Sequence, residues 1–436
     1  MTVNLHDRDG RVLEQIQAEP DTTEPANPLT SIAGETFSQD EYVSWTVNQY
    51  TKTRLTATAS YYDIPTTSSD PDSDDFTGSE GTHYNVNSYG YDSSGRMVRS
   101  ESPGGTINHT FFDPRGLTTE IWVGTDDVPT SDHNSDGSTD FLDFRYYVQQ
   151  NGSAPAGTNM VIVTENEYDD GSDGGDGLLT TVTQHVDSSN TRTTEYGYDW
   201  RNRRLWTYQH DGTRGTYTYL TYDNLGRVTK TERYWDDDSD FSTQGPETSS
   251  DDNLIARTET AYDDRGRVYE TTRHEVDPSD GSVGNSLTDE TWYDAAGNVI
   301  RTQSAGTEQF SKTKYDGLGR PVAQYVGYDT DEDTYAEIYD STNHVVKIDG
   351  DTIFAQTDYD HNDAGQTIFV TSRQRLNDAT GTGELNGPSG SQPKSRDSYV
   401  AYWHDEIGRQ TEVANYGTNG GTAMTAGPAR TLGKLG

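Results

Sequence analysis

The sequence predicts an all-β fold, an array of β-hairpins with acidic loop insertions, and three observations lead to it. Residues 222–228 read Tyr-Asp-Asn-Leu-Gly-Arg-Val, and closely related segments begin at Tyr91, Tyr262, Tyr293 and Tyr315. The residues before each segment alternate polar and apolar and are rich in Thr and Tyr, as is typical of β-strands. Only 29% of the 436 residues are apolar, well below the ~45–50% of ordinary globular chains. Repeated thin layers therefore suit this chain better than one large core.

Each repeated segment contains the residues that a tight turn needs. An Asp at the head of a turn accepts hydrogen bonds from backbone N–H groups, and Gly adopts the positive φ that such turns often require. We expect the Tyr to pack toward neighbouring layers and the Arg to pair with Asp along the ladder rather than to bind an anionic ligand. The predicted turn residues are Tyr91, Asp92, Gly95, Arg96, Tyr222, Asp223, Gly226, Arg227, Tyr262, Asp263, Gly266, Arg267, Tyr293, Asp294, Gly297, Tyr315, Asp316, Gly319 and Arg320.

Less regular units continue the pattern. Residues 112–116 read Phe-Asp-Pro-Arg-Gly, and Asn202 takes the place of Gly in the unit that begins at residue 198. After Asp360 the Gly comes late, at Gly365, which predicts a lengthened turn. Asp340 is interpreted as a further turn Asp.

The turn aspartates recur at intervals of about 20–24 residues, which leaves room for two or three short strands per unit. Longer gaps indicate the same unit with an inserted loop. We therefore expect one repeat array over residues 1–415, without amphipathic helices of about ten residues or more, and a Gly-rich tail or truncated next repeat over 416–436. The expected polar insertions lie near residues 14–40, 64–82, 125–143, 235–253, 277–289 and 377–396.

The charge of the chain argues against several classes of partner. With 73 acidic and 32 basic residues, the formal net charge is −41. Such a charge opposes binding to nucleic acid and to anionic lipid, whose phosphates need Lys and Arg, and it favours divalent cations or a saline exterior. No apolar run approaches the roughly 18–20 residues that cross a bilayer, so membrane insertion is not expected. The chain has no Cys, so disulfides do not stabilise it.

The sharpest candidate ligand site is the acidic loop of residues 132–143. Oxygen-bearing side chains stand at loop positions 1, 3, 5, 9 and 12, with Gly137 at position 6, which is the spacing of an EF-hand-like calcium loop. The competing interpretation is an acidic loop that is merely solvated. The expected Ca²⁺ ligands are Asp132, Asn134, Asp136, the carbonyl of Ser138, Asp140 and Asp143.

Signals for catalysis are poor, and we expect no enzymatic activity. The sequence has no His-Glu-x-x-His zinc motif, no Gly-x-Ser-x-Gly elbow, no phosphate-binding Gly-x-x-x-x-Gly-Lys and no Cys nucleophile. Five tryptophans are open to two interpretations, a sugar-binding surface or packing between layers, and packing is favoured. They are Trp122, Trp206, Trp235, Trp292 and Trp403.

The repeated units resemble the YD repeat of the Rhs and teneurin proteins. The match is carried by the Tyr-Asp and Gly-Arg pairs that begin at Tyr91, Tyr222, Tyr262 and Tyr315. This resemblance implies a β-sheet that spirals into a β-solenoid or hollow shell, which encloses a toxin in bacterial polymorphic toxins and forms part of an adhesion ectodomain in teneurins. Residues 113–117, Asp-Pro-Arg-Gly-Leu, match the letters of the family's self-cleavage sequence. They stand in phase with the hairpins, so a turn is the favoured interpretation.

The leading functional hypothesis is a structural segment of a secreted or surface-exposed Rhs-like protein, stabilised by calcium, that forms an enclosing shell or an extended fibre wall. We expect this sequence to be a piece of a longer protein. Its expected partners are other segments of the same chain, like subunits, or an enclosed effector domain. Two alternatives stay open, the shell of a polymorphic toxin whose effector lies outside this sequence and a carbohydrate-binding or adhesive module.

Overall fold

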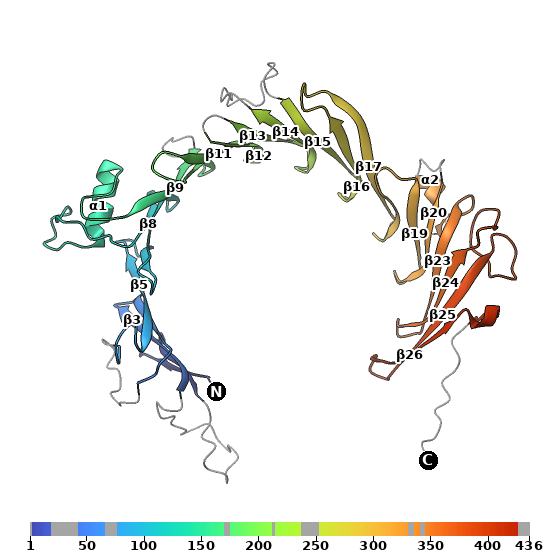
Figure 1. Cartoon of the computed structure of the whole chain (residues 1–436), viewed down its shortest axis with the longest axis horizontal. Coiled ribbons are helices and arrows are strands. Elements are labelled where there is room, and N and C mark those ends of the chain that lie inside the picture. The colour runs from blue at the N-terminus through green and yellow to red at the C-terminus, as the bar shows by residue number, and fades with distance from the viewer. Residues whose placement is uncertain are drawn as a thin grey trace, which may run out of the picture. The chain divides into compact units, whose positions relative to one another are not determined.

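The computed structural model describes residues 2–18, 42–65, 76–169, 175–211, 214–236, 253–329, 335–340 and 345–425. Within these residues the chain is nearly all β, which confirms the predicted fold class. It divides into two compact units, Met1–Gly215 and Thr216–Gly436, whose strands are labelled in Figure 1. No described helix is long and apolar enough to cross a membrane.

Unit 1 is a series of antiparallel strands in which each described strand pairs with the next along the chain. A single described helix interrupts the series between β8 and β9. The elements are β1 (Thr2–His6), β2 (Val12–Ala18), β3 (Tyr42–Thr51), β4 (Arg54–Tyr61), β5 (Tyr84–Tyr91), β6 (Met97–Glu101), β7 (Ile107–Phe112), β8 (Thr118–Gly124), α1 (Phe141–Asn151), β9 (Val161–Tyr168), β10 (Leu179–His185), β11 (Thr191–Tyr198) and β12 (Arg204–His210).

Unit 2 repeats the arrangement, with antiparallel pairing from β14 onward. Strand β13 (Gly215–Tyr222) lies at the boundary, and β20 pairs directly with β23 because α2, β21 and β22 form a side excursion. The other elements are β14 (Val228–Asp236), β15 (Asn253–Tyr262), β16 (Val268–Val276), β17 (Val283–Tyr293), β18 (Val299–Gln303), β19 (Gln309–Tyr315), β20 (Pro321–Tyr328), α2 (Tyr335–Ile338), β21 (Tyr339–Asp340), β22 (Val345–Val346), β23 (Thr352–His361), β24 (Thr367–Arg375), β25 (Ser395–His404), β26 (Gln410–Gly417) and the 3-10 turn η3 (Asn419–Gly421).

The repeat turns share one backbone geometry. In the unit of residues 222–228 the N–H of Asp223 donates to the carbonyl of Arg227 at 3.0 Å, and the N–H of Gly226 donates to the carbonyl of Asp223 at 3.1 Å. Gly226 has a φ of 84°, so the loop is a type I turn followed by a left-handed Gly. The register shifts by one residue beside such turns, as between Ala261 and Tyr262, which is the bulge that this loop type introduces.

Each unit buries its apolar side chains in several small clusters along the strands. In unit 1, Trp45 and Tyr61 stack with ring centroids 4.2 Å apart beside Ile16. In unit 2, Tyr325 and Tyr399 are 1% and 2% exposed, so tyrosines supply much of the buried area. These clusters lie along the sheet, as expected when neighbouring layers rather than one central core stabilise a repeat protein.

The expectation that the chain lacks a helix of about ten residues is wrong, because α1 has 11 residues. Its start is set by a capping box, in which Asp140 accepts the N–H of Leu142 at 2.7 Å and Asp143 accepts the N–H of Asp140 at 3.1 Å. Gly152, with a φ of 64°, ends it. The apolar stripe is too short to give a clear helical period, since Phe144 and Val148 are its only buried apolar residues.

Two turn assignments made from the sequence are also wrong. The turn after Tyr359 is not lengthened, because Asn362 takes the role of the turn Asp and accepts the N–H of Gln366 at 3.0 Å, with Gly365 in its usual place. Asp340 does not head a repeat turn, because it belongs to β21, which pairs with β22 outside the main ladder.

The expected insertions differ in what the structure gives for them. Strand β2 continues to Ala18, and β17 already begins at Val283, so the ranges 14–40 and 277–289 contain strand residues. The excursion near 125–143 extends as far as residue 160, because β9 begins at Val161. Residues 19–41, 66–75 and 237–252, which make up most of three predicted insertions, and residues 426–436 of the predicted tail lie outside the described residues. The first part of the tail is described, because β26 continues to Gly417 and η3 follows it. The range 377–396 is described as well, and β25 begins inside it at Ser395.

Candidate functional site

The carboxylate at the head of each repeat turn binds its own turn. In the unit that begins at Tyr262, Oδ1 of Asp263 accepts the backbone N–H groups of Arg265 and Arg267, each at 2.9 Å. Oδ2 accepts Nε of Arg267 at 2.7 Å. The same Arg-to-Asp bond forms in the units headed by Asp92, Asp223 and Asp316, whereas Asn298 replaces the Arg in the unit of Asp294.

These hydrogen bonds favour the charged form of the turn aspartates. Backbone and guanidinium donors of Arg227 hold the pKa of Asp223 below its usual range. At Asp263, burial opposes ionisation, but the N–H and guanidinium donors of Arg267 lower the pKa overall. Charged carboxylates at these positions therefore belong to the folded turn.

The Arg of one repeat hairpin also binds the following hairpin. Nη1 of Arg227 donates to the carbonyl of Asp263 at 3.4 Å, and its guanidinium lies 4.5 Å from the ring centroid of Tyr262. Arg267 makes the same contact one hairpin later, with the carbonyl of Asp294 and the ring of Tyr293. In unit 1, Arg96 contacts the carbonyl of Asp113 and the ring of Phe112 in the same manner.

The turn Tyr returns the contact. The hydroxyl of Tyr262 donates to the carbonyl of Val228 at 2.9 Å, and the hydroxyl of Tyr293 donates to the carbonyl of Val268 at 3.0 Å. Each acceptor directly follows the Arg of the preceding unit. The Arg and Tyr of the repeat therefore link successive hairpins in both directions, and we call this set of contacts the Arg–Tyr relay.

The acidic loop of residues 132–143 folds around its own polar groups. Asp132 accepts the N–H groups of Ser135 at 2.6 Å and Gly137 at 2.9 Å, through different oxygens. Oδ1 of Asp136 accepts the N–H and the hydroxyl of Ser138 at 2.9 and 2.7 Å, which lowers the pKa of Asp136. Gly137 has a φ of 93°, which fits the sharp turn required at position 6 of an EF-hand-like loop.

Asp143 differs from the other predicted ligands because it is fully buried. Its Oδ1 accepts the N–H groups of His133 at 2.6 Å and Asn134 at 2.8 Å, while Oδ2 accepts that of Asp140. Burial opposes its ionisation, but these backbone donors lower its pKa overall. Asp143 thus ties the start of the loop to the first turn of α1.

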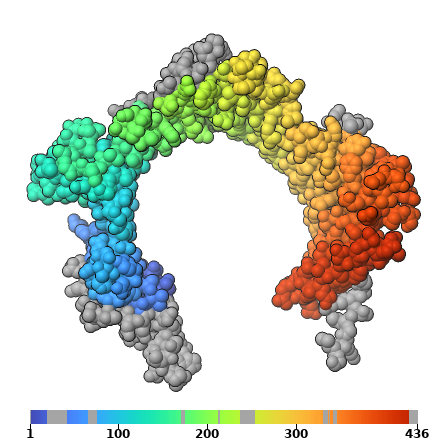
Figure 2. Space-filling view, in the orientation of Figure 1, coloured from blue at the N-terminus to red at the C-terminus, as the bar shows by residue number. Residues whose placement is uncertain are grey.

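The helix after the loop packs on the strands of unit 1, and the excursion protrudes beside them in Figure 2. Phe144 and Val148, 0% and 2% exposed, join a cluster with Phe111, Trp122 and Met160. Arg145 reaches between them and donates to the carbonyl of Thr110 at 2.9 Å and to that of Val98 at 3.3 Å.

A buried charged group lies beside this helix. Nε2 of His109 is 2.7 Å from Oδ2 of Asp127, and Nε of Arg99 is 2.6 Å from the same oxygen. Nη1 of Arg145 lies 3.5 Å from Nδ1 of His109, so the ring proton stands on Nε2 and is donated to Asp127. Burial lowers the pKa of His109. Burial raises the pKa of Asp127, but its donors outweigh this and lower it to about 2.

The charged group was not predicted from the sequence, whereas contacts between neighbouring hairpins were, through the expected packing of Tyr and pairing of Arg along the ladder. The four members come from residues 99, 109, 127 and 145, and no local motif connects them. The Arg–Tyr relay left a signal, because Arg and Tyr recur in phase, but the recurrence does not reveal that the partner belongs to the following unit.

The other candidates are placed as follows. Trp122 and Trp206 are buried, whereas Trp235 is 41% exposed. Residues 113–117 form an ordinary repeat turn, closed by a bond of 2.9 Å from the N–H of Asp113 to the carbonyl of Leu117. Among the described residues, no three His, Asp or Glu side chains are arranged to hold a metal ion as they stand.

Comparison with known proteins gives similarity to solved structures alone. No family model and no curated protein matches the chain. The Tc holotoxin pore of Photorhabdus luminescens is similar over 95% of this chain and 19% of that chain, at 14% identity and a TM-score of 0.37. A TcdB2–TccC3–TEV crystal structure is similar over 94% and 21%, at 13% identity and a TM-score of 0.35. A TcdB2–TccC3–Cdc42 structure is similar over 95% and 19%, at 15% identity and a TM-score of 0.37. The chain thus spans about a fifth of the length of the chains it resembles, and these values carry no conclusion about function.

Proposed function

We propose that this chain is a stretch of β-wall in a secreted or surface-exposed protein of the Rhs and teneurin type. Its work is to enclose or present other parts of the same chain or like subunits, and it is not enzymatic. The Arg–Tyr relay is the observation that carries this proposal. Because the relay binds successive described hairpins through their own repeat residues, hairpins can be added in sequence without a central core.

Cryo-electron microscopy of the complete protein that contains this sequence tests the proposal. We expect successive hairpins to form one continuous wall. A closed wall around separate density identifies a shell, and density of an effector domain inside it identifies the toxin alternative. An open array that leads to a surface anchor identifies a fibre. Hairpins distributed among separate globular domains would contradict the proposal.

We further propose that the loop of residues 132–143 binds Ca²⁺. Its donors are hard oxygens, which suit this ion, and α1 begins directly after position 9, as the exit helix does in an EF-hand. The side chains of Asp132, Asn134, Asp136 and Asp140 and the carbonyl of Ser138 would hold the ion. Asp143 would complete the set while it keeps the loop attached to α1.

A thermal unfolding titration tests the calcium site. At a hundredfold excess of Ca²⁺ over the dissociation constant, the free energy of unfolding is expected to rise by about 2.7 kcal/mol, because the ion binds the folded state alone. Asp136→Ala should abolish the gain. Asp277→Ala is the matched control, since Asp277 accepts the N–H and hydroxyl of Ser279 just as Asp136 accepts those of Ser138. Wild-type protein that gains no stability at millimolar Ca²⁺ would refute the site.

A further inference from the structure

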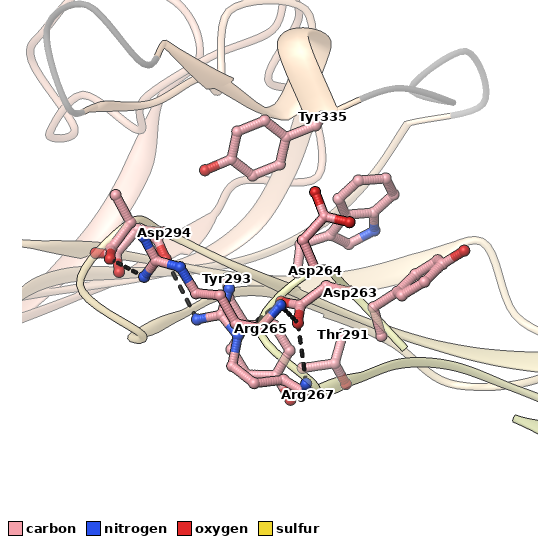
Figure 3. Close-up of a pocket in the computed structure, with 11 residues that line it drawn as sticks. Asp263, Asp264, Arg265, Arg267, Thr291, Tyr293, Asp294 and Tyr335 are labelled. Carbon is pink, nitrogen blue, oxygen red and sulfur yellow. Dashed lines mark hydrogen bonds and ion pairs between the residues drawn. The ribbon is translucent and has the colours of Figure 1, made fainter. Parts of the chain in front are cut away.

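A cavity of about 460 Å³ lies in unit 2 beneath the α2 excursion. One side is formed by the turn of residues 263–267 and by residues 291–295 of the next hairpin, and the opposite side by Tyr335 of α2 (Figure 3). The volume falls within the range of ordinary small-ligand sites, about 300–1,000 Å³. A second cavity of about 700 Å³ shares Asp294 and Ala295 with the first, so the space continues past this hairpin turn.

The apolar lining of the first cavity is aromatic. The rings of Trp292 and Tyr335 lie 6.1 Å apart with an angle of 28° between their planes, and Tyr269 lies 6.5 Å from Trp292. All three side chains are half-buried. Their positions are fixed, because Nε1 of Trp292 donates to Glu290 at 3.3 Å and Trp292 and Tyr335 pack against the cluster around Ile300.

Most charged side chains that line the cavity already have partners within the repeat turns. Arg267 binds Asp263 and the carbonyl of Asp294, and both oxygens of Asp294 accept hydrogen bonds within their own turn. Asp264 stands apart from this set. Its carboxylate is exposed, makes no hydrogen bond or ion pair with any described residue, and points to the side of the cavity where Tyr335 lies (Figure 3).

The neighbour of Asp264 supplies the complementary group. Arg265 donates one guanidinium N–H to the carbonyl of Ala295, and its remaining N–H groups extend the donor capacity at the cavity. The hydroxyl of Tyr335 makes no hydrogen bond with a described residue. A free acceptor, donor groups and a hydroxyl thus surround a half-buried aromatic surface.

This combination selects among ligand classes. An anion is disfavoured because three carboxylates face two guanidiniums in the lining and the whole chain carries −41. A cation is disfavoured because the guanidinium of Arg265 stands next to Asp264 in the lining. A neutral sugar has hydroxyls that donate to a carboxylate and accept from a guanidinium, and its C–H faces pack on aromatic rings.

We propose that this cavity binds a neutral oligosaccharide. One sugar ring packs against Trp292 and Tyr335, its hydroxyls bind Asp264 and Arg265, and the neighbouring cavity past Asp294 accommodates the next unit. The α2 excursion creates the site, because it places Tyr335 over a turn that otherwise has the same geometry as the other repeat turns. The site needs neither an enclosed guest nor the calcium loop.

Binding of neutral and anionic oligosaccharides on a glycan array, followed by calorimetric titration of the best neutral binder in the presence of EDTA, tests this site. Asp264→Ala and Tyr335→Ala should each weaken binding roughly tenfold or more, since each removes a contact made in a partly desolvated site. The matched control is Glu406→Ala, because Glu406 is also exposed and occupies the same position in the turn headed by Asp405. It should change affinity by less than about twofold.

Asp264→Asn keeps the shape of the side chain and tests the charge alone should the Ala variant fold poorly. The proposal is overturned if no neutral oligosaccharide binds, if binding survives both Asp264→Asn and Tyr335→Ala unchanged, or if anionic glycans alone bind. None of these outcomes would affect the proposed wall function, which is judged by electron microscopy. Equally, electron microscopy that contradicts the wall function would not change the result of the calorimetric titration.

Discussion

The excursion between β8 and β9 and the excursion between β20 and β23 both pack back on strands of their own unit, but with different results. In the first, which we call the solid excursion, Phe144 and Val148 pack against the strands beside the charged group around Asp127. The second, which we call the hollow excursion, buries Ile338 and Tyr339 among its described residues. It is flanked by cavities of about 460 and 700 Å³.

This difference gives the two proposed sites different structural settings. The hairpins beneath both excursions use the same turn residues, so their chemistry is nearly constant along the chain. The solid excursion adds a rigid helix next to an acidic loop, which suits an ion that stabilises the fold. The hollow excursion adds an aromatic ring over a turn, which suits a ligand.

The largest expected effect is the loss of packing in the solid excursion. Phe144→Ala should destabilise unit 1 by about 3–5 kcal/mol, because it removes a fully buried aromatic ring and leaves a cavity. Chemical denaturation measures the loss, and hydrogen exchange should place it in α1, β7 and β8. Tyr146→Ala, at a side chain of the same helix that is 46% exposed, should cost far less. Equal losses in both variants would show that α1 is not docked through Phe144.

The hollow excursion should depend instead on a buried ion pair. Nζ of Lys312 lies 2.7 Å from Oδ2 of Asp351, and both side chains are almost completely buried. Asp351→Leu should destabilise unit 2 by about 3 kcal/mol, because it leaves a buried ammonium without its carboxylate. The double variant Lys312→Met, Asp351→Leu should recover most of that loss. Arg273→Ala breaks the exposed pair with Asp289 and should change stability by less than about 1 kcal/mol.

Acid should affect the solid excursion through Asp127. The pKa of its carboxyl falls from the ordinary value of 3.8 to about 2 on folding, so its contribution to stability is complete above pH 3.8. It declines as the pH falls below 3.8 and is gone below pH 2, a loss of about 2 kcal/mol. The difference in unfolding free energy between wild type and Asp127→Asn, measured against pH, should shrink in that window. A difference that stays constant down to pH 2 would contradict the pairing with Arg99 and His109.

The smallest expected effect concerns the hairpins that both excursions share. Tyr262→Phe removes the hydroxyl that donates to the carbonyl of Val228 but keeps the ring beside Arg227. The expected cost is about 1 kcal/mol, the net value of one hydrogen bond. Tyr196→Phe serves as control, since the Tyr196 hydroxyl makes no hydrogen bond with a described residue, and it should be neutral. If the two variants are equally stable, the Arg–Tyr relay does not contribute through its hydroxyl.

Local chemistry explains how much of the fold could be predicted. The turn geometry at Asp223 and Gly226 follows from residues within one heptad, so the sequence predicted it correctly. The turn at Asn362 was misassigned because Asn can replace Asp as a backbone acceptor, and Tyr359-Asp360 just upstream has the same two residues as the start of the motif. Helix α1 was missed because its signal is a capping box and a stripe of two buried apolar residues.

The sequence by itself determined the hairpin unit, its repetition, the acidic character of the chain and the spacing of oxygen donors between Asp132 and Asp143. These properties depend on residues close together in the chain, whose conformations are fixed by turn and strand chemistry. Tertiary structure decided which distant groups meet: Arg227 with the ring of Tyr262, Asp127 with Arg99 and His109, and Tyr335 with Trp292. Strand pairing and the return of the two excursions create those contacts, and no local pattern specifies them.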